Sequence, residues 1–116
     1  MDFQTAVQTV VMQKYANFNG RATRSEYWWF ILAYVVAYLV LAIVDYLIGA
    51  QLLTSILALG LLIPSIAVGI RRLHDLDKSG WWLLLGLVPI VGLILLYWFC
   101  QPGTPGDNQF GPPPAA

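Results

Sequence analysis

Charge and cysteine are both scarce in this sequence. Only 10% of the 116 residues are Asp, Glu, Lys or Arg, and the six basic residues equal the six acidic ones in number. The single cysteine, Cys100, excludes an intrachain disulfide and a multi-cysteine metal site. The sequence also lacks a phosphate-binding glycine loop, a zinc motif, a nucleophile elbow and a basic nucleic-acid surface. We therefore expect no metal, no cofactor and no nucleic-acid partner.

Long apolar runs fill most of the chain instead. They cover Tyr27–Val44, Leu52–Ile70 and Trp81–Cys100, and each is 18 to 20 residues long. About 20 helical residues cross the roughly 30 Å hydrocarbon core of a bilayer. A soluble domain of this length has no interior deep enough for three such helices. The sequence therefore predicts an all-α membrane protein, with three transmembrane helices in one domain over residues 1–116.

Residues 3–18 predict a further helix with one apolar face. Apolar residues recur there at steps of three and four, namely Phe3, Ala6, Val7, Val10, Val11, Tyr15 and Phe18. The segment is too short and too polar to span a membrane. We expect an amphipathic helix in the cytoplasmic interface, and the alternative is that its apolar face packs on the helix bundle or on another subunit.

The positions of the basic residues predict the topology. Three of them precede the first run and three lie between the second and the third, namely Lys14, Arg21, Arg24, Arg71, Arg72 and Lys78. The connection 45–51 and the Pro/Gly-rich tail 101–116 contain none. Because cytoplasmic loops are enriched in Lys and Arg, we expect a cytoplasmic N-terminus and a periplasmic or extracellular C-terminus.

Aromatic residues and a capping motif flank the predicted spans. Thr23 and Glu26 have the spacing of a capping box directly before the first span. Interfacial aromatic belts are expected at the cytoplasmic ends, from Tyr27, Trp28, Trp29, Trp81 and Trp82, and at the outer end, from Tyr97 and Trp98.

Proline and small residues interrupt the second and third spans. Pro64 and Pro89 each remove a backbone donor that lipid cannot replace, so a neighbouring helix or hydroxyl must compensate. Ser65 and Gly69 form a small-residue pair that lets another helix approach closely. So small a bundle buries little of its own surface, and we expect an oligomer.

The polar residues on the cytoplasmic side form the candidate site. They are Arg21, Arg24, Glu26, Arg71, Arg72, His74, Asp75 and Lys78. Helical spacing allows Arg71 to pair with Asp75, and Arg72 can reach Glu26 across helices. Three interpretations compete: topology signals that snorkel into headgroups, a headgroup-recognition site, and an acid–base pair of His74 and Asp75.

Two further acidic positions allow alternatives. Asp45 lies at the outer interface if the first span ends at Val44, and inside the bilayer, as part of an ion or proton path, if the helix continues through Ile48. Asp107 and Asn108 in the tail have too few oxygen ligands for calcium and predict a surface turn.

The sequence resembles the DUF805 family of small bacterial inner-membrane proteins of unknown function. The resemblance rests on residues 18–30 (FNGRATRSEYWWF), 71–75 (RRLHD), 79–82 (SGWW) and 103–111 (GTPGDNQFG). It implies a bacterial cytoplasmic membrane and one domain, and it supplies no activity. The family pattern falls on Gly20, Arg21, Arg24, Glu26, Arg72, His74, Asp75, Ser79, Gly80 and Trp81, with Trp82 beside them, and on Asn108 and Gly111. The resemblance implies a defined polar site or a fixed ion-pair network, with a tail ordered against the bundle.

These observations favour a non-enzymatic role. We expect binding of anionic lipid headgroups, or of partner membrane proteins, through the cytoplasmic cluster. One alternative is an oligomeric transporter or channel, with Pro64 and Pro89 kinking the helices and Asp45 or His74 handling protons. The other is an intramembrane lipid-modifying enzyme that uses His74 and Asp75.

Overall fold

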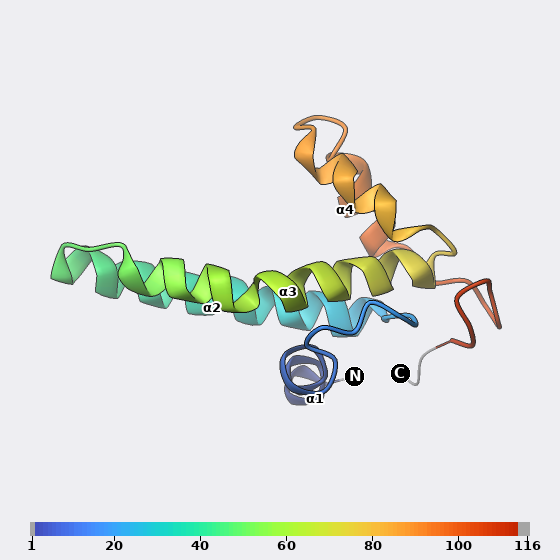
Figure 1. The fold of residues 1–116 in the computed structure, drawn as a ribbon, viewed down its shortest axis with the longest axis horizontal. Helices are drawn as coiled ribbons and strands as arrows, with labels where there is room; N and C mark the ends of the chain where they lie inside the picture. Colours follow the sequence, from blue (N-terminus) through green and yellow to red (C-terminus); the bar gives the residue numbers. More distant parts are fainter. Residues whose placement is uncertain (1, 114–116) are drawn as a thin grey trace.

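The structure describes residues 2–113 of a computed structural model, and its regular elements within these residues are helices, joined by turns and irregular segments (Figure 1). The one β contact among them is an isolated bridge between Asn108 and Gly111. Predictions for residues 114–116 lie outside the described residues. The elements are α1 (Phe3–Gln8), the π-helix η1 (Thr9–Gln13), α2 (Arg24–Ile48), α3 (Leu52–Asp75), the 3₁₀-helix η2 (Gly80–Leu87) and α4 (Leu93–Cys100).

Helices α2 and α3 form a long antiparallel hairpin, joined by a short connection in which Gly49 adopts a left-handed conformation with φ 73°. Both helices are long and apolar enough to cross a membrane, and they extend beyond the predicted first two spans. Only 6% of the most apolar window of α2 and 22% of that of α3 is buried. A core helix of a soluble protein buries most of its apolar surface, so this exposure is typical of a membrane helix.

Asp45 caps α3 from the neighbouring helix. Helix α2 does continue through Ile48, but the Asp45 carboxylate accepts hydrogen bonds from the Leu53 amide at 3.1 Å and from the Thr54 amide and hydroxyl at 3.0 Å each. These amides belong to the first turn of α3, where no intrahelical acceptor exists. The contacts of Asp45 are therefore those of a structural cap, and they give a proton path no support.

The prediction of one continuous helix over residues 81–100 is wrong. Helix η2 ends at Leu87, a turn follows, and α4 returns beside η2 to the end from which η2 started (Figure 1). Pro89 lies in that turn, where it cannot continue a helix. A Cβ on Gly92 would lie 2.9 Å from the Val88 carbonyl oxygen, so the close backbone approach in the turn requires glycine.

The tail consequently lies at the same end as the basic cluster, which we call the arginine end: the start of α2, the end of α3 and the end of α4. Trp98 packs edge-on against Trp82 with ring centroids 5.7 Å apart, and the Trp28 indole donates to the Phe99 carbonyl at 3.1 Å. The end of α4 and the tail therefore lie at the same end of the hairpin as Trp28 and Trp82, whereas the predicted outer belt of Tyr97 and Trp98 and the predicted outer tail require the opposite end. The reversal of the chain at Pro89 is the reason.

The N-terminal helical segment ends at Gln13 and is therefore shorter than the predicted helix over residues 3–18. Its axis runs across α2 and α3, since the segment is seen end-on where those helices lie lengthwise (Figure 1). Ala6 and Val10 are buried, and Val10 packs with Phe30 of α2 and Val68 of α3. The alternative in which the apolar face packs on the bundle is thus what the structure contains.

Pro64 of α3 has the compensating hydroxyl that its sequence position requires. Proline has no N–H, so the carbonyl oxygen of Gly60, four residues earlier, loses its intrahelical donor. The Tyr15 hydroxyl donates to that oxygen at 2.5 Å.

The small-residue pair of α3 serves packing within the chain. A Cβ on Gly69 would lie 3.1 Å from a methyl group of Leu83, so glycine lets η2 lie close against α3. Ser65, its partner in the predicted pair, has a buried hydroxyl with no hydrogen-bond partner among the described residues.

Candidate functional site

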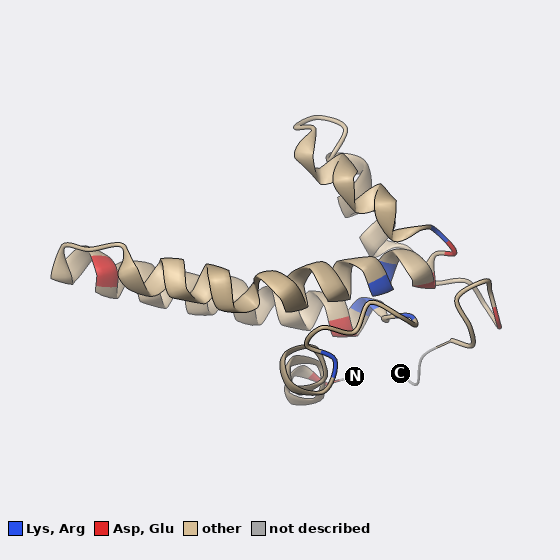
Figure 2. Ribbon diagram, viewed as in Figure 1, with Lys and Arg blue, Asp and Glu red and all other residues tan. Residues whose placement is uncertain are grey.

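Three arginines are almost completely buried at the arginine end. Arg21 is 3% exposed, and Arg71 and Arg72 are 0% exposed. Basic and acidic residues gather at this end, and Asp45 stands alone among the charges at the far end of the hairpin (Figure 2). Burying a guanidinium is costly unless its charge and its donors have partners. The local fold therefore depends on where those partners come from.

Arg71 pairs with Glu26 across the two long helices. Both side chains are fully buried, and the Arg71 Nε donates to the Asn17 carbonyl at 3.1 Å. Thr23 accepts from the Glu26 amide at 3.1 Å, as the capping box predicts, but the Glu26 carboxylate turns to Arg71. The Glu26 Oε1 and Arg71 Nη2 atoms make no hydrogen bond among the described residues.

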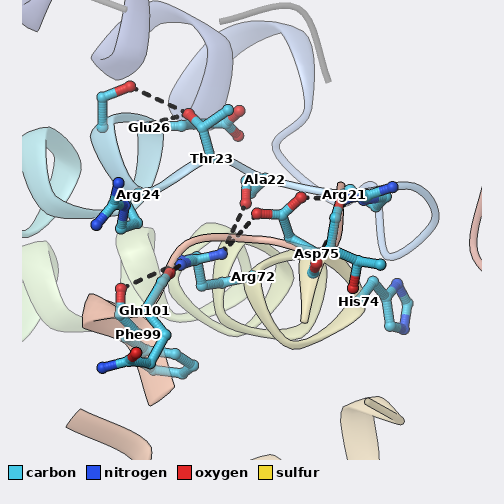
Figure 3. Close-up of polar contacts among 12 residues, drawn as sticks. Arg21, Ala22, Thr23, Arg24, Glu26, Arg72, His74, Asp75, Phe99 and Gln101 are labelled. Carbon is cyan, nitrogen blue, oxygen red and sulfur yellow. Dashed lines mark hydrogen bonds and ion pairs between the residues drawn. The ribbon is translucent and has the colours of Figure 1, made fainter. Parts of the chain in front are cut away.

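Asp75 is shared by two arginines. Its Oδ1 lies 3.0 Å from Arg21 Nε, and its Oδ2 lies 2.7 Å from Arg72 Nη1 (Figure 3). The predicted pairs, Arg71 with Asp75 and Arg72 with Glu26, are therefore exchanged. The reason is the direction of each side chain on α3. Arg71 faces Glu26 at the start of α2, whereas Arg72 faces the Ala22 carbonyl and the carbonyls at the end of α4.

The remaining donors of Arg21 go to backbone carbonyls of the C-terminal tail. One Nη donates to Thr104 at 2.6 Å, and the other donates to Gly106 at 2.8 Å and Gly111 at 3.2 Å. The Thr104 amide donates in turn to the Asp75 carbonyl at 2.7 Å. Arg21 thereby ties the N-terminal arm, the end of α3 and the tail together.

Arg72 and Arg24 hold the C-terminal end of α4. Arg72 donates to the Phe99 carbonyl at 3.3 Å and to the Gln101 carbonyl, and Arg24 donates to the Cys100 carbonyl at 3.2 Å (Figure 3). The last carbonyls of a helix have no intrahelical donor and carry the negative end of the helix dipole. Cationic donors at this position satisfy both requirements, which explains why basic residues gather there.

The composition of the tail suits it to this role. Pro102 and Pro105 have no N–H, so the tail cannot satisfy all its own carbonyls, and these oxygens stay available to Arg21. Gly106 and Gly111 adopt φ values of 72° and 110°, which favour glycine. At Gly103 a Cβ would overlap the Asp75 carboxylate, so only glycine lets the tail pass this close.

His74 anchors the tail from the other side. Its ring stacks on Phe110 with centroids 3.9 Å apart and planes 7° from parallel. Its Nδ1 lies 2.9 Å from the Gly20 carbonyl oxygen, an acceptor, so Nδ1 carries the proton in the neutral ring. The side-chain amide of Asn108 donates to the His74 carbonyl at 2.9 Å. His74 and Asp75 thus face different partners, and the acid–base pair considered from the sequence is not assembled.

The other predicted residues surround this network. Lys78 places its ammonium 4.5 Å from the centre of the Trp98 ring, and a Cβ on Gly80 would lie 2.8 Å from Ile70. Trp81 is largely exposed, and Gly20 adopts a left-handed φ of 84° beside His74. The structure therefore brings Arg21, Arg24, Arg72, His74 and Asp75 together on the tail, and keeps Arg71 and Glu26 as a separate pair.

Backbone atoms supply the contacts that the sequence-based prediction missed. The carbonyls of Asn17, Gln101 and Thr104 complete the arginine network, and the Phe110 ring covers His74. The density of proline and glycine in the tail was the available signal, because such a segment has unpaired carbonyls. The described residues contain no group of three or more His, Cys, Asp or Glu side chains that could hold a metal ion. The arrangement instead suits the binding of neutral or anionic oxygen acceptors.

An all-helical chain with two exposed apolar helices and a buried charge network at one end has the features of a small membrane protein. Residues 15–112 match the family model of DUF805, described as a protein of unknown function. The chain is 46% identical over 111 residues to the inner membrane protein YhaH of Escherichia coli strain K12, with 90% of this chain and 92% of that protein covered. It is 41% identical over 107 residues to the inner membrane protein YhaI of the same strain, with 90% and 91% covered. The chain belongs to the DUF805 family. No solved structure matches it.

Proposed function

We propose that this chain is a non-enzymatic inner-membrane protein that binds anionic lipid headgroups at its arginine end. The contacts come from the accessible cations, which are the exposed Arg24 and the half-buried Lys78 at that end, together with the half-buried Lys14 of the N-terminal segment that crosses α2 and α3. The buried arginines serve instead to fix the shape of that end. This assignment narrows the prediction from the sequence, because a headgroup cannot reach the Arg21 and Arg72 guanidiniums while their donors are bound to tail carbonyls.

One observation carries the proposal: all five tryptophans lie on elements that begin or end at the arginine end. Trp28 and Trp29 open α2, Trp81 and Trp82 open η2, and Trp98 lies in the last turns of α4. Tryptophan is enriched at the level of the headgroups, and Lys and Arg are enriched on the cytoplasmic side. Together they favour an arginine end at the cytoplasmic headgroup layer.

The proposed membrane placement follows from lengths and exposure. The part of α2 from Phe30 to Ile48 is about 28 Å long, which matches the hydrocarbon core. The N-terminal segment lies across the two spans and would rest in the interface. The hairpin of η2 and α4 exposes Leu87 and Ile90, each 81%, at its turn. We place that apolar turn in the cytoplasmic leaflet, so both ends of the chain are cytoplasmic.

The test is the lipid that the protein retains when native mass spectrometry releases it from nanodiscs of mixed phosphatidylglycerol and phosphatidylcholine. Each basic residue near an anionic surface contributes about 1 kcal/mol, so each neutralised cation should lower the retained ratio of anionic to zwitterionic lipid about fivefold. The variant is Lys14→Gln/Arg24→Gln/Lys78→Gln, and the exposed Gln13→Ala is the matched control. An unchanged ratio in the triple variant would refute the proposal.

An oligomeric transporter or channel is the alternative. It needs charged or readily charged groups near the membrane midplane, and residues 30–44 and 52–70 contain no Asp, Glu, Lys, Arg or His. The carboxylate nearest to them, Asp45, already accepts three hydrogen bonds from α3. Proton or ion flux into proteoliposomes that is abolished by Asp45→Asn would favour this alternative over lipid binding.

A further inference from the structure

Most of the acceptors around the arginine network are neutral backbone carbonyls. Segment 99–111 contributes six carbonyl oxygens to Arg21, Arg24 and Arg72, namely those of Phe99, Cys100, Gln101, Thr104, Gly106 and Gly111. A carbonyl is neutral, and it binds a guanidinium more weakly than a carboxylate or a phosphate does. We call residues 101–111 the strap, because they pass over Asp75 and contact the buried Arg21 and Arg72.

The charges on the two sides do not balance. Three guanidiniums contact segment 99–111, and Asp75 is the only carboxylate paired with any of them among the described residues. Three positive charges and one negative charge leave an excess of two positive charges, and the dipole of α4 offsets only about half a charge. The strap has one acidic residue, Asp107, and its side chain is exposed rather than directed at the arginines.

Hydrogen bonds rather than apolar contacts hold most of the strap in place. It has no helix, and its only large apolar side chain is Phe110, which stacks on His74. Its other contacts are hydrogen bonds. Arg21 and Arg72 donate to its carbonyls, the Thr104 amide and the Asn108 side-chain amide donate to the carbonyls of Asp75 and His74, and Gln109 donates twice to Asp77. Segments with few apolar contacts open at a lower free-energy cost than the packed helices around them.

We propose that the strap covers a phosphate site formed by Arg21 and Arg72 on either side of Asp75, with Arg24 at its exposed edge. When the strap leaves, its carbonyls are replaced by the oxygens of one phosphate group, which guanidiniums bind through paired donors. This inference rests on the proposed function, since it gives the headgroup-binding end a second, covered site. Strap and phosphate compete for the same donors, so binding of one releases the other.

Hydrogen exchange of the full chain in nanodiscs tests this competition. The reporters are the Thr104 amide, bonded to the Asp75 carbonyl at 2.7 Å, and the Gln109 amide, bonded to the Asp77 carboxylate at 3.2 Å. Exchange is compared in phosphatidylcholine alone, in phosphatidylcholine with phosphatidylglycerol, and in phosphatidylcholine with inorganic phosphate. The choline ammonium neutralises the phosphate charge of phosphatidylcholine, so we expect the added anionic ligand to speed exchange of both amides about tenfold.

The arms separate the source of the phosphate. Faster exchange with phosphatidylglycerol alone assigns the site to a lipid headgroup, and faster exchange with inorganic phosphate assigns it to a phosphate from solution. Exchange that is unchanged or slower in both arms overturns the inference. If the strap does not move while the triple cation variant still loses anionic lipid, the proposed function stands and only the covered site fails.

A variant that leaves every arginine in place provides the second test. Phe110→Ala removes the aromatic anchor of the strap, and Phe3→Ala, an exposed phenylalanine at the other end of the sequence, is the matched control. A loosened strap should raise the retained phosphatidylglycerol several-fold in Phe110→Ala and leave the control at the wild-type value. Equal or lower retention in Phe110→Ala would contradict a competing strap.

Discussion

We expect the Tyr15 hydroxyl to stabilise the protein only because Pro64 is present. Tyr15 donates to the Gly60 carbonyl, which has no intrahelical donor since residue 64 is proline. Tyr15→Phe removes one oxygen and leaves a carbonyl without a partner. A lost hydrogen bond of this kind costs about 1–2 kcal/mol, whereas membrane-protein cycles average nearer to about 0.6 kcal/mol. We therefore expect Tyr15→Phe to lower the free energy of unfolding by about 1 kcal/mol.

Replacing the proline should abolish most of that cost. Pro64→Ala restores a backbone N–H that can donate to Gly60, so the carbonyl keeps a partner when the hydroxyl is absent. In the Pro64→Ala background, Tyr15→Phe should cost less than about 0.5 kcal/mol. The difference between the two costs is the coupling energy, and it excludes any separate effect of filling the buried proline position with alanine.

The assay is reversible unfolding in mixed micelles, followed by circular dichroism, for the wild type, both single variants and the double variant. Tyr46→Phe is the control, because Tyr46 is 85% exposed at the far end of the hairpin. An equal cost of Tyr15→Phe with and without Pro64 would refute the reasoning, since the hydroxyl would then act independently of the missing amide.

Two further predictions concern the charge network. Gly103→Ala places a Cβ on the Asp75 carboxylate and breaks its buried ion pairs, so it should lower the free energy of unfolding by roughly 3 kcal/mol. Gly60→Ala is the control, because the same Cβ meets open space there and should change the free energy of unfolding little. Glu26→Gln leaves Arg71 buried without a carboxylate and should cost roughly 3 kcal/mol or more, whereas the double variant Glu26→Met/Arg71→Met should recover most of that loss. Denaturant titration measures both, and a double variant as unstable as Glu26→Gln would contradict the second.

The sequence predicted the elements whose signal is local and continuous. The first two apolar runs correspond to α2 and α3, and Thr23 caps α2 at the predicted residue. The prediction of a single helix over the third apolar run was wrong, because average hydropathy does not show that the chain reverses direction within the run. Pro89 and Gly92 were visible in the sequence, but they matter only through the backbone approach at the turn.

The site was predicted in part for a similar reason. Basic and acidic residues at one end follow from their positions between apolar runs, so their gathering was predictable. Which arginine meets which carboxylate depends on the faces that α2 and α3 present to each other, and adjacent residues such as Arg71 and Arg72 differ only in that respect. The carbonyl acceptors of the tail were not predictable from side chains, because they belong to the backbone.

The order in which the ribosome makes the chain gives the contacts of Arg21 a further meaning. Its tail acceptors Thr104, Gly106 and Gly111 lie 83, 85 and 90 residues further along the sequence. Arg21 is therefore synthesised well before these acceptors, and its donors lack them until residues 104–111 have been made. The arginine end can close only after that point, although the α2–α3 hairpin beside it is already complete.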